Sequence, residues 1–399
     1  MPLVPVLVDM QRHGMKLDVV VLRELAATLS QDLARVEREI YEVVGHQFNV
    51  NSPKQLADVL FVELRLPRTR RTRTGGYTTD AAALEELRGA HPIVEKLLEY
   101  RQLAKLKSTY VDALPQMVNP RTGRVHTSFN QAGASSGRLA SSEPNLMNIP
   151  VRTELGRAIR RAFVAEREGW TLLSADYSQI ELRVLAHLSR DEHLVAAFLH
   201  GQDIHRATAS LMFNVPLEEV TPEHRRIAKV LNFGVIYGLS PYGISQQTRF
   251  TPEEGARFIE AYFAKYPGIR RYVEDTKEKV RRLGYVETLL GRRRHVPEVH
   301  SPNYATRSAA ERMAINHPVQ GTAAEIMKLA MVRIHRRLEE EALRSMLLLQ
   351  VHDELIFEAP QEEVEPLTAL VQEEMPRALQ LVVPLRVDVK VGRSWGDME

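Results

Sequence analysis

The chain has 399 residues, of which 44% are hydrophobic and 26% charged, an ordinary globular composition that supports a large core without disulfide or metal staples. It contains no cysteine, which excludes disulfides, cysteine-bound zinc or iron–sulfur sites and a thiol nucleophile. The 53 basic residues nearly balance the 51 acidic ones, and the net charge of +2 means that a phosphate-binding surface has to be local. Of the basic residues 42 are Arg, which suits bidentate phosphate contacts but follows equally from a GC-rich genome or heat adaptation.

Targeting segments are not evident in the sequence. No apolar run approaches the roughly 18 residues of a membrane span. The first five residues lack a basic segment and soon meet Asp9, which is unlike a secretory signal. We therefore expect a cytoplasmic protein without a membrane partner.

The first half of the chain begins helical. Helical spacing of apolar residues predicts one helix over residues 18–48 and another over about 81–108. The loop between them carries five arginines within residues 65–73. It is either a solvated tip or a loop that follows a phosphate backbone.

From about residue 120 the pattern changes to short β-like runs, which end in the apolar strand 171–176. Residues 181–340 are mostly helical and are punctuated by prolines. Residues 346–358 and 383–389 return to strand patterns. This order suggests a split β domain that carries two helical insertions.

Several common motifs are missing or fail. There is no GxxxxGK phosphate loop and no HExxH zinc helix. Residues 133–137 match GxSxG, but polar residues flank them where a hydrolase elbow needs an apolar strand and a helix.

Two acidic segments are more specific. A strand ends on Asp176, and Ser178 can cap the helix that follows, so that one carboxylate projects at a strand end. Asp353 and Glu354 lie in a polar tip of three residues between apolar runs, which is typical of a β-hairpin. Acids at turns are usually only solvated, but Asp176 and Asp353 on neighbouring strands could share divalent cations.

A third segment, residues 221–238, reads as a helix with Thr221 as its N-cap and Pro222 at its first position. One face carries two cations followed by two aromatic rings, namely Arg225, Lys229, Phe233 and Tyr237. The opposite face is apolar. A surface helix explains the cations, whereas a bound nucleoside triphosphate explains all four residues together.

At these residues the sequence resembles the family A DNA polymerases of the bacterial DNA polymerase I type. The three segments resemble the first palm motif, the finger-helix motif and the last palm motif of the family. The likeness extends to residues 136–150 and 316–322 and covers nearly the whole chain in order. The chain begins where the polymerase region begins, so we expect neither proofreading nor 5′ nuclease activity from it.

The resemblance implies an α+β fold of the right-hand polymerase type, with an antiparallel β palm and a helical thumb and fingers. The implied parts are a palm entry segment (1–17), the thumb (18–108), the first part of the palm (109–180), the fingers (181–340) and the second part of the palm (341–399). It also implies a monomeric bacterial protein associated with the nucleoid.

The implied activity is template-directed addition of dNTPs to a primer 3′ end by nucleotidyl transfer with two Mg²⁺ ions, for which Mn²⁺ can substitute. Asp176 and Asp353 would hold both ions, with the Tyr177 carbonyl as a further ligand. Glu354 is either an outer-shell acid or an exposed turn residue. Lys229 would stabilise or protonate the leaving pyrophosphate.

The resemblance also implies residues that bind the incoming dNTP. His205 and Arg225 would hold its outer phosphates, and Glu181 would exclude a ribose 2′-hydroxyl. Phe233 would face the sugar, and Tyr237 would stack in the template position before the fingers close. The full implied set is Gln179, Glu181, His205, Arg225, Lys229, Phe233 and Tyr237.

Implied contacts with primer–template DNA include minor-groove readers, which test pairing because the acceptors there are common to all Watson–Crick pairs. The implied set is Arg138, Asn145, Asn148, Arg312, Asn316, Gln320, His352, Lys105 and Lys107. The run Arg292–Arg294 is either a template-strand patch or a solvated basic segment.

Two rival functions remain. A single-subunit RNA polymerase or a reverse transcriptase would share the two-metal chemistry, but Glu181 in its Gln-Ile-Glu context favours DNA synthesis. A non-catalytic DNA-binding module would not need Asp176, Asp353 and Lys229 together.

Overall fold

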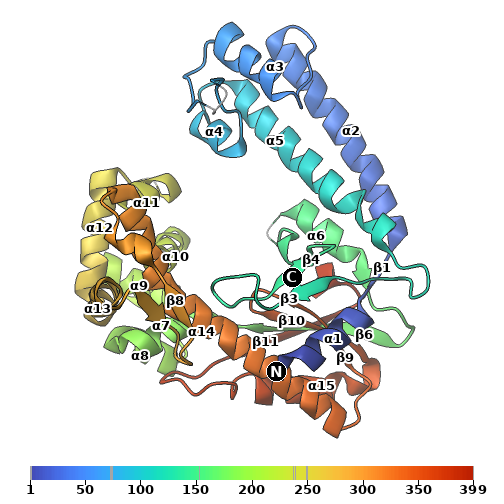
Figure 1. Ribbon diagram of the computed structural model, residues 1–399, viewed down its shortest axis with the longest axis vertical. Coiled ribbons are helices and arrows are strands. Elements are labelled where there is room, and N and C mark those ends of the chain that lie inside the picture. The colour runs from blue at the N-terminus through green and yellow to red at the C-terminus, as the bar shows by residue number, and fades with distance from the viewer. Residues whose placement is uncertain are drawn as a thin grey trace.

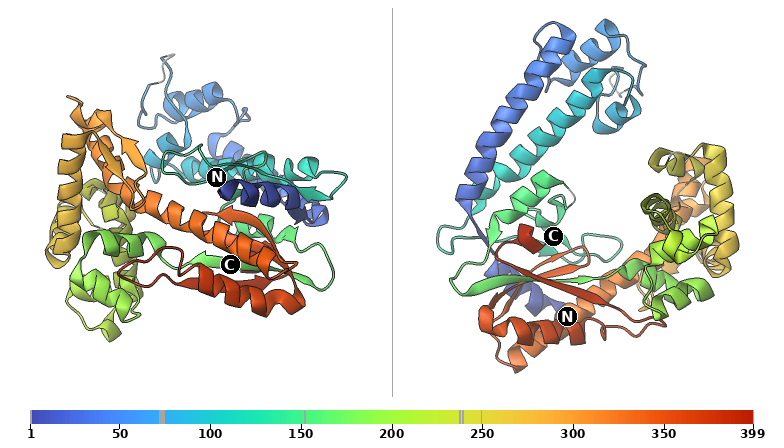
Figure 2. Two further views of the ribbon diagram at one scale, coloured as in Figure 1. Left: turned by 60° about the horizontal axis from the view of Figure 1, so that its bottom comes forward. Right: turned by 180° about the vertical axis from the view of Figure 1, so that it is seen from behind.

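The computed structural model of the protein describes residues 2–71, 75–151, 153–236, 238, 240–248 and 250–398. Figure 1 shows a β-sheet with two helical parts that rise from the same side of it, a long arm at one end and a lobe at the other. Further helices cover the opposite side of the sheet (Figure 2).

The main sheet has the strand order β11-β6-β10-β9, and all neighbouring strands are antiparallel. Its strands are β6 (Trp170–Tyr177), β9 (Met346–Val351), β10 (Glu354–Pro360) and β11 (Val387–Gly392). The helices on its covered side are α1 (Leu3–His13), α14 (Tyr304–Glu340) and α15 (Val364–Glu374). The largest core cluster fills the space between them with side chains such as Met10, Met331, Phe357 and Leu370.

The arm consists of two long helices, α2 (Val19–Val44) and α5 (Pro92–Leu106), with α3 (Pro53–Asp58) and α4 (Ala81–Glu86) at its tip. Asp18 caps α2 by accepting hydrogen bonds from the amides of Val20 and Val21. The first predicted helix is confirmed except for its last turn. The second is interrupted between α4 and α5 and then continues as a π-helical segment, Lys107–Val111.

The lobe contains seven helices within its described residues. They are α7 (Ile180–Ser189), α8 (Glu192–Leu199), α9 (Ile204–Phe213), α10 (Pro222–Ile236), α11 (Pro241–Gln247), α12 (Pro252–Lys265) and α13 (Pro267–Leu283). Four of them begin at a proline, because proline has no amide hydrogen to lose at that position. A short hairpin, β7 (Tyr285–Glu287) and β8 (Arg293–His295), interrupts the stretch that we predicted to be mostly helical.

Smaller elements join the arm to the sheet. Strands β1 (Met15–Leu17), β2 (Arg124–Val125) and β5 (Phe163–Val164) form one small sheet. Strands β3 (Ser128–Asn130) and β4 (Ala140–Ser142) form another, and α6 (Glu154–Arg161) follows them. Among the described helices, none combines the length and the apolar character that crossing a membrane needs.

Two local predictions were wrong. Strand β6 ends one residue later, at Tyr177, and α7 starts from Gln179 in the left-handed region with φ 56°, without a side-chain cap. The backbone of Ser178 is already engaged, because its amide donates to the Arg386 carbonyl and its carbonyl accepts from Arg183. Strand β11 begins at Val387 rather than 383, since the preceding apolar residues pack into the core instead of pairing.

Candidate active site

Two acidic residues meet where β6 ends and the β9–β10 hairpin turns. The amide of Tyr177 donates a 3.0 Å hydrogen bond to the carbonyl of Asp353, so the residue after Asp176 is bonded to the hairpin tip. The tip itself is shorter than predicted, since only His352 and Asp353 lie between the strands, and His352 takes φ 53°. The register therefore brings Asp176 and Asp353 to one end of the sheet.

A row of three acids crosses the sheet beside this turn. Glu354 on β10 and Asp388 on β11 are both register partners of Asp176, which lies between them on β6. Residues that face each other in an antiparallel pair project from the same face. Glu354 accepts a hydrogen bond from Ser174 Oγ, and Lys390 lies opposite Ser174 on β11.

Asp388 and Lys390 are residues that our sequence reasoning missed. Both line a cavity of about 500 Å³ together with Asp176 and Glu354. The signal was present in the alternation of residues 387–391, in which valines alternate with Asp388 and Lys390. However, the alternation alone does not say which strand β11 pairs with.

Both acids lie in an environment that disfavours their charged form. The pKa of Asp176 is raised to about 7, chiefly by burial and also by the charges of Glu354, Asp353 and Asp388, while Lys390 opposes the rise. Burial likewise raises the pKa of Asp353 to about 6, with Glu181 adding to the shift and Arg138 opposing it. Carboxylates that repel one another in this way gain from a shared cation.

The donor set fits a hard divalent ion. Aspartate oxygens are the ligands that Mg²⁺ prefers, and Asp176 remains open to solvent within its cavity. Asp353 lines a separate, smaller cavity with Arg138, Gln350 and His352. Among the described residues, Asp176, Asp353 and Glu354 do not bring three carboxylate oxygens within 4.8 Å of one another.

Helix α10 lies in the lobe and presents the predicted cationic face. Thr221 caps it through a 3.1 Å hydrogen bond from the His224 amide. Of the predicted apolar face, Ile227, Leu231 and Gly234 are buried, whereas Val230 is only half-buried. Arg225, Lys229 and Phe233 are each partly exposed, whereas Tyr237 lies outside the described residues.

His205 on α9 is packed against this helix. Its ring lies 5.7 Å from the ring of Phe233, and its Nδ1 lies 3.1 Å from Asn232 Nδ2. An amide nitrogen can only donate, so Nδ1 accepts and the proton of the neutral ring is on Nε2. Burial lowers the pKa of His205 to about 4, and the charges of Arg225 and Lys229 act in the same direction.

Arg225 has a partner within the lobe. Its Nε donates a 2.9 Å hydrogen bond to Asp203, whose other oxygen caps α9. This bond orients the guanidinium and leaves its two terminal nitrogens for a ligand. Arg225, His205, Lys229 and Phe233 thus form one group.

The lobe group and the acids lie in different parts of the structure (Figure 1). The cations that lower the pKa values of Asp176 and Asp353 are Lys390 and Arg138, rather than Lys229. The structure therefore gathers the predicted residues into two groups and does not bring Lys229 against the acids.

Glu181 connects the first turn of α7 to the acids. It is 5% exposed, and its Oε1 accepts a 2.6 Å hydrogen bond from Arg138. Its charge also raises the pKa of Asp353. Gln179, two residues earlier, is half-buried at the start of the same helix. These contacts fix the Glu181 carboxylate close to Asp353.

Part of the predicted nucleic-acid set lines one cavity of about 710 Å³. Lys105, Asn145, Asn148 and His352 come to it from α5, the segment after β4 and the β9–β10 turn. Lys107 is engaged elsewhere, because its Nζ lies 2.8 Å from Asp112. This pairing competes with a phosphate for the Lys107 charge.

The predicted residues on α14 follow one another along its first half. Arg312 is exposed and donates to Ser308 Oγ, and its side chain passes close to Gly238. Asn316 has a buried Oδ1 without a partner among the described residues. Gln320 is half-buried one turn further on. Arg292 is bound by Glu325, which favours a structural role over a free basic patch.

Comparison with known families decides the relationship. The family model described as "DNA polymerase family A" matches residues 19–397. The chain belongs to this family. A solved structure described as "POL domain of Pol1 from M. smegmatis complex with DNA primer-template and dNTP" matches with a TM-score of 0.93 and 47% identity, covering 100% of this chain and 70% of that one. The predicted α+β right-hand fold, with an antiparallel palm and helical thumb and fingers, is confirmed.

Two DNA polymerase I relatives are similar to the chain over nearly its whole length. The thermostable DNA polymerase I of Thermus aquaticus is 55% identical over 395 residues, which are 99% of this chain and 47% of that protein. The DNA polymerase I of Geobacillus stearothermophilus is 52% identical over 396 residues, which are 99% of this chain and 45% of that protein. The chain thus spans about half the length of these relatives.

Proposed function

We propose that this chain is a DNA-directed DNA polymerase that adds dNTPs to a primer 3′ end under the direction of a template. The observation that carries the proposal is the hydrogen bond between the Tyr177 amide and the Asp353 carbonyl, which joins the end of β6 to the hairpin tip. The charge of Asp353 is one of those that raise the pKa of Asp176, which supports a shared role for the two acids. Family membership supports it, and so does the likeness to a solved relative described as a complex with DNA primer-template and dNTP.

Asp176 and Asp353, with the Tyr177 carbonyl, are the residues that we assign to two Mg²⁺ ions, or Mn²⁺ in their place. When bound, the ions supply electrostatic stabilisation for phosphoryl oxygens and lower the pKa of a coordinated hydroxyl. Glu354, held by Ser174, contributes its negative charge to the same site without being assigned as a ligand.

The lobe group on α9 and α10 would bind the triphosphate. The neutral ring of His205 carries its proton on Nε2, and this N–H would donate to a phosphate oxygen. The ring is uncharged at neutral pH because its pKa is lowered to about 4. Arg225 would donate from its two terminal nitrogens. Lys229 would stabilise or protonate the pyrophosphate that leaves, and the exposed edge of Phe233 would contact the sugar.

Because the lobe group and the acids lie apart, the proposed reaction requires the lobe to approach the sheet when a nucleotide binds. Closing of this kind brings a bound nucleotide to the reacting groups and excludes water. Tyr237, which lies outside the described residues, would leave the template position during closing.

Glu181 would act as the steric gate at the sugar. Arg138 holds its carboxylate in place near Asp353, so an additional 2′-hydroxyl would meet a fixed and buried group. Gln179 is assigned to the same nucleotide site at the start of α7.

The duplex would lie between the arm, the sheet and α14. Lys105, Asn145, Asn148 and His352 would contact it in their shared cavity, with Lys107 beside them. Arg138 and Gln320 would read the minor groove, and Arg312 and Asn316 would contact the template. We assign the arm (18–108) to the thumb, 181–340 to the fingers, and 1–17, 109–180 and 341–399 to the palm of a monomeric enzyme.

The decisive experiment is single-turnover primer extension by the full chain with Mg²⁺. Asp176→Asn and Asp353→Asn should each slow extension by about 1000-fold or more, because each removes a charge where transition-state charge develops. Affinity for primer–template, followed by fluorescence anisotropy, should stay within a few-fold. Asp275→Asn, at an exposed position on α13, is the matched control and should extend normally.

Other outcomes distinguish the rival functions. Extension with NTPs in place of dNTPs would identify an RNA polymerase, and a preference for an RNA template would identify a reverse transcriptase. DNA binding without any primer extension would indicate a non-catalytic DNA-binding module. Glu181→Ala should raise ribonucleotide incorporation when dNTPs and NTPs compete. If the preference for dNTPs over NTPs is unchanged, Glu181 is not the steric gate.

A further inference from the structure

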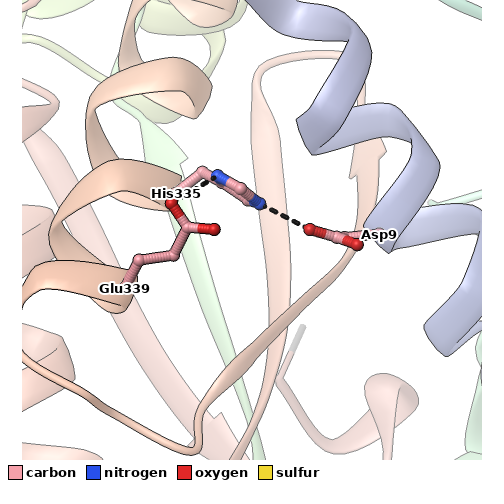
Figure 3. Close-up of side chains that lie close together, drawn as sticks. All are labelled: Asp9, His335 and Glu339. Atoms are coloured by element: carbon pink, nitrogen blue, oxygen red, sulfur yellow. Dashed lines mark hydrogen bonds and ion pairs between the residues drawn. The ribbon is translucent and has the colours of Figure 1, made fainter.

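A cluster of potential metal ligands lies on the covered side of the sheet, away from the candidate active site. It consists of Asp9 on α1 and of His335 and Glu339 on α14, whose ligand atoms all lie within 4.8 Å of one another (Figure 3). His335 Nε2 lies 2.8 Å from Asp9 Oδ2, and His335 Nδ1 lies 3.8 Å from Glu339 Oε2. Among the described residues this is the one group of three that meets the distance.

The helices fix the spacing of these ligands. His335 and Glu339 are four residues apart on α14, so they project from the same face one above the other. Asp9 approaches them from α1, which packs along α14. Asp9 faces Nε2 of the imidazole and Glu339 faces Nδ1, and one ring nitrogen binds one ion. One of the two carboxylate side chains therefore has to rotate around the ring before all three residues share an ion, whose ligands lie roughly 3–3.5 Å apart at Zn²⁺ distances of about 2 Å.

Room for further ligands is present beside the cluster. Asp9, His335 and Glu339 line a cavity of about 420 Å³ that is open to water. His13 lines the same cavity, and its Nδ1 is buried without a hydrogen-bond partner among the described residues. A water molecule bound to an ion at the cluster could complete the coordination, as at zinc sites with three protein ligands.

The local charge favours a cation. The carboxylates of Asp9 and Glu339 both lie against His335, and Arg12, which lies 4.0 Å from Asp9, has a largely exposed side chain. Glu339 is in the last turn of α14, where the helix dipole disfavours a negative charge. The next two acids, Glu340 and Glu341, are each contacted by an arginine, whereas Glu339 lies against His335.

We propose that Asp9, His335 and Glu339 bind one divalent transition-metal ion, of which Zn²⁺ is the representative, and that the ion links α1 to α14. One imidazole and two carboxylates form a mixed nitrogen and oxygen set, which binds Zn²⁺ in preference to Mg²⁺. This site is separate from the magnesium site at Asp176 and Asp353, and it does not depend on the proposed polymerase activity.

The test measures bound zinc in the full chain. Protein stripped with a chelator is equilibrated with Zn²⁺ in an excess of Mg²⁺, which occupies the acids of the active site, and bound zinc is counted by mass spectrometry after gel filtration. The wild-type chain should carry one more equivalent than His335→Gln, with the same loss in Asp9→Asn. His46→Gln is the matched control, because His46 forms a similar 2.7 Å pair with the single acid Glu63, and it should bind as the wild type does.

A second measurement separates a metal site from a simple ion pair. Zn²⁺ should raise the Tm of the wild type but not that of His335→Gln, since a ligand that binds only the folded state stabilises it. Equal zinc content in the wild type and His335→Gln would overturn the proposal. It would equally be overturned if His335→Gln lowered the Tm by the same amount with and without zinc.

Should His335→Gln fail to fold, Glu339→Gln at the exposed end of the cluster provides the same comparison. Its zinc affinity, measured by calorimetry, should fall by at least about tenfold. Removing a residue that only hydrogen-bonds to a metal ligand already lowers metal affinity by about this factor, and removing a direct ligand should lower it at least as much. Unchanged affinity would contradict the assignment.

Discussion

His205 is a buried histidine whose pKa differs between the folded and the unfolded chain. In the unfolded chain it binds a proton with an ordinary pKa of 6.5, whereas burial lowers its pKa to about 4 in the folded protein. Between these values the unfolded state binds more protons, so stability rises with pH across the window and is lost as the pH falls from 6.5 to 4. The difference corresponds to about 3 kcal/mol at the lower end.

His205→Gln should therefore reduce the acid sensitivity of the protein. Urea unfolding of the wild type should show a loss of stability between pH 7 and pH 4.5 that exceeds that of the variant by about 2–3 kcal/mol. His46→Gln is the comparison, because Glu63 raises the pKa of the exposed His46 and so gives the opposite sign. Equal acid sensitivity in wild type and His205→Gln would show that the ring titrates freely.

At this scale the sequence singled out Asp176 and Asp353 but not the acid that pairs with Asp176 across the sheet. Asp176 and Asp353 stood out in the sequence because each lies at the end of an apolar run, which is a local signal. Asp388 faces Asp176 only through the pairing of β11 with β6. No local signal encodes that pairing, so the third acid of the row appears only in the folded chain.

Helix α10 is the element whose function is most sharply testable. Arg225→Ala should raise the KM for dNTP by about 10- to 100-fold, the effect of losing 1.5–3 kcal/mol of hydrogen bonding to a charged group. Lys229→Ala should lower the single-turnover rate more than it raises KM, since its proposed partner is the leaving group. Steady-state and single-turnover extension separate the two effects.

Arg226 on the same helix supplies the control. It is exposed, pairs with Glu223 and donates to the Gln247 carbonyl, so it faces away from the Arg225 group. Arg226→Ala should leave dNTP KM within about twofold, as expected for an exposed pair. If Arg225→Ala and Arg226→Ala behave alike, the α10 face does not bind the nucleotide.

Elements were predicted well where one stretch of sequence determines them. The start of α10 is encoded by Thr221 and Pro222, and the β9–β10 hairpin by its apolar runs. The start of α7 was not predictable, because the amide of Ser178 donates to the carbonyl of Arg386, which is about 200 residues away in the chain. Helix α1 carries helical spacing at Leu3, Val6, Leu7 and Met10, yet its partner α14 lies some 300 residues away in the chain.

The arrangement of the whole molecule was accessible only through family resemblance. The strand order β11-β6-β10-β9 joins segments from both halves of the chain, and periodicity cannot specify it. Folding also brings together residues that are far apart in the chain, so a nearly neutral chain can still have a local surface suited to phosphate. Lys105, at the base of the arm, comes to one cavity with His352 from the last hairpin.

Binding of primer–template should consequently depend strongly on salt despite a net charge of +2. If about four phosphates are neutralised, counterion release predicts a loss of affinity of about 100-fold between 50 and 200 mM salt. Fluorescence anisotropy with one duplex over this range gives the slope directly. Lys105→Ala should weaken binding and reduce the slope by about one ion, whereas Lys54→Ala at the arm tip, outside the cavity, should leave the slope unchanged. An affinity that stays flat with salt would mean that base and sugar contacts, rather than clustered cations, hold the DNA.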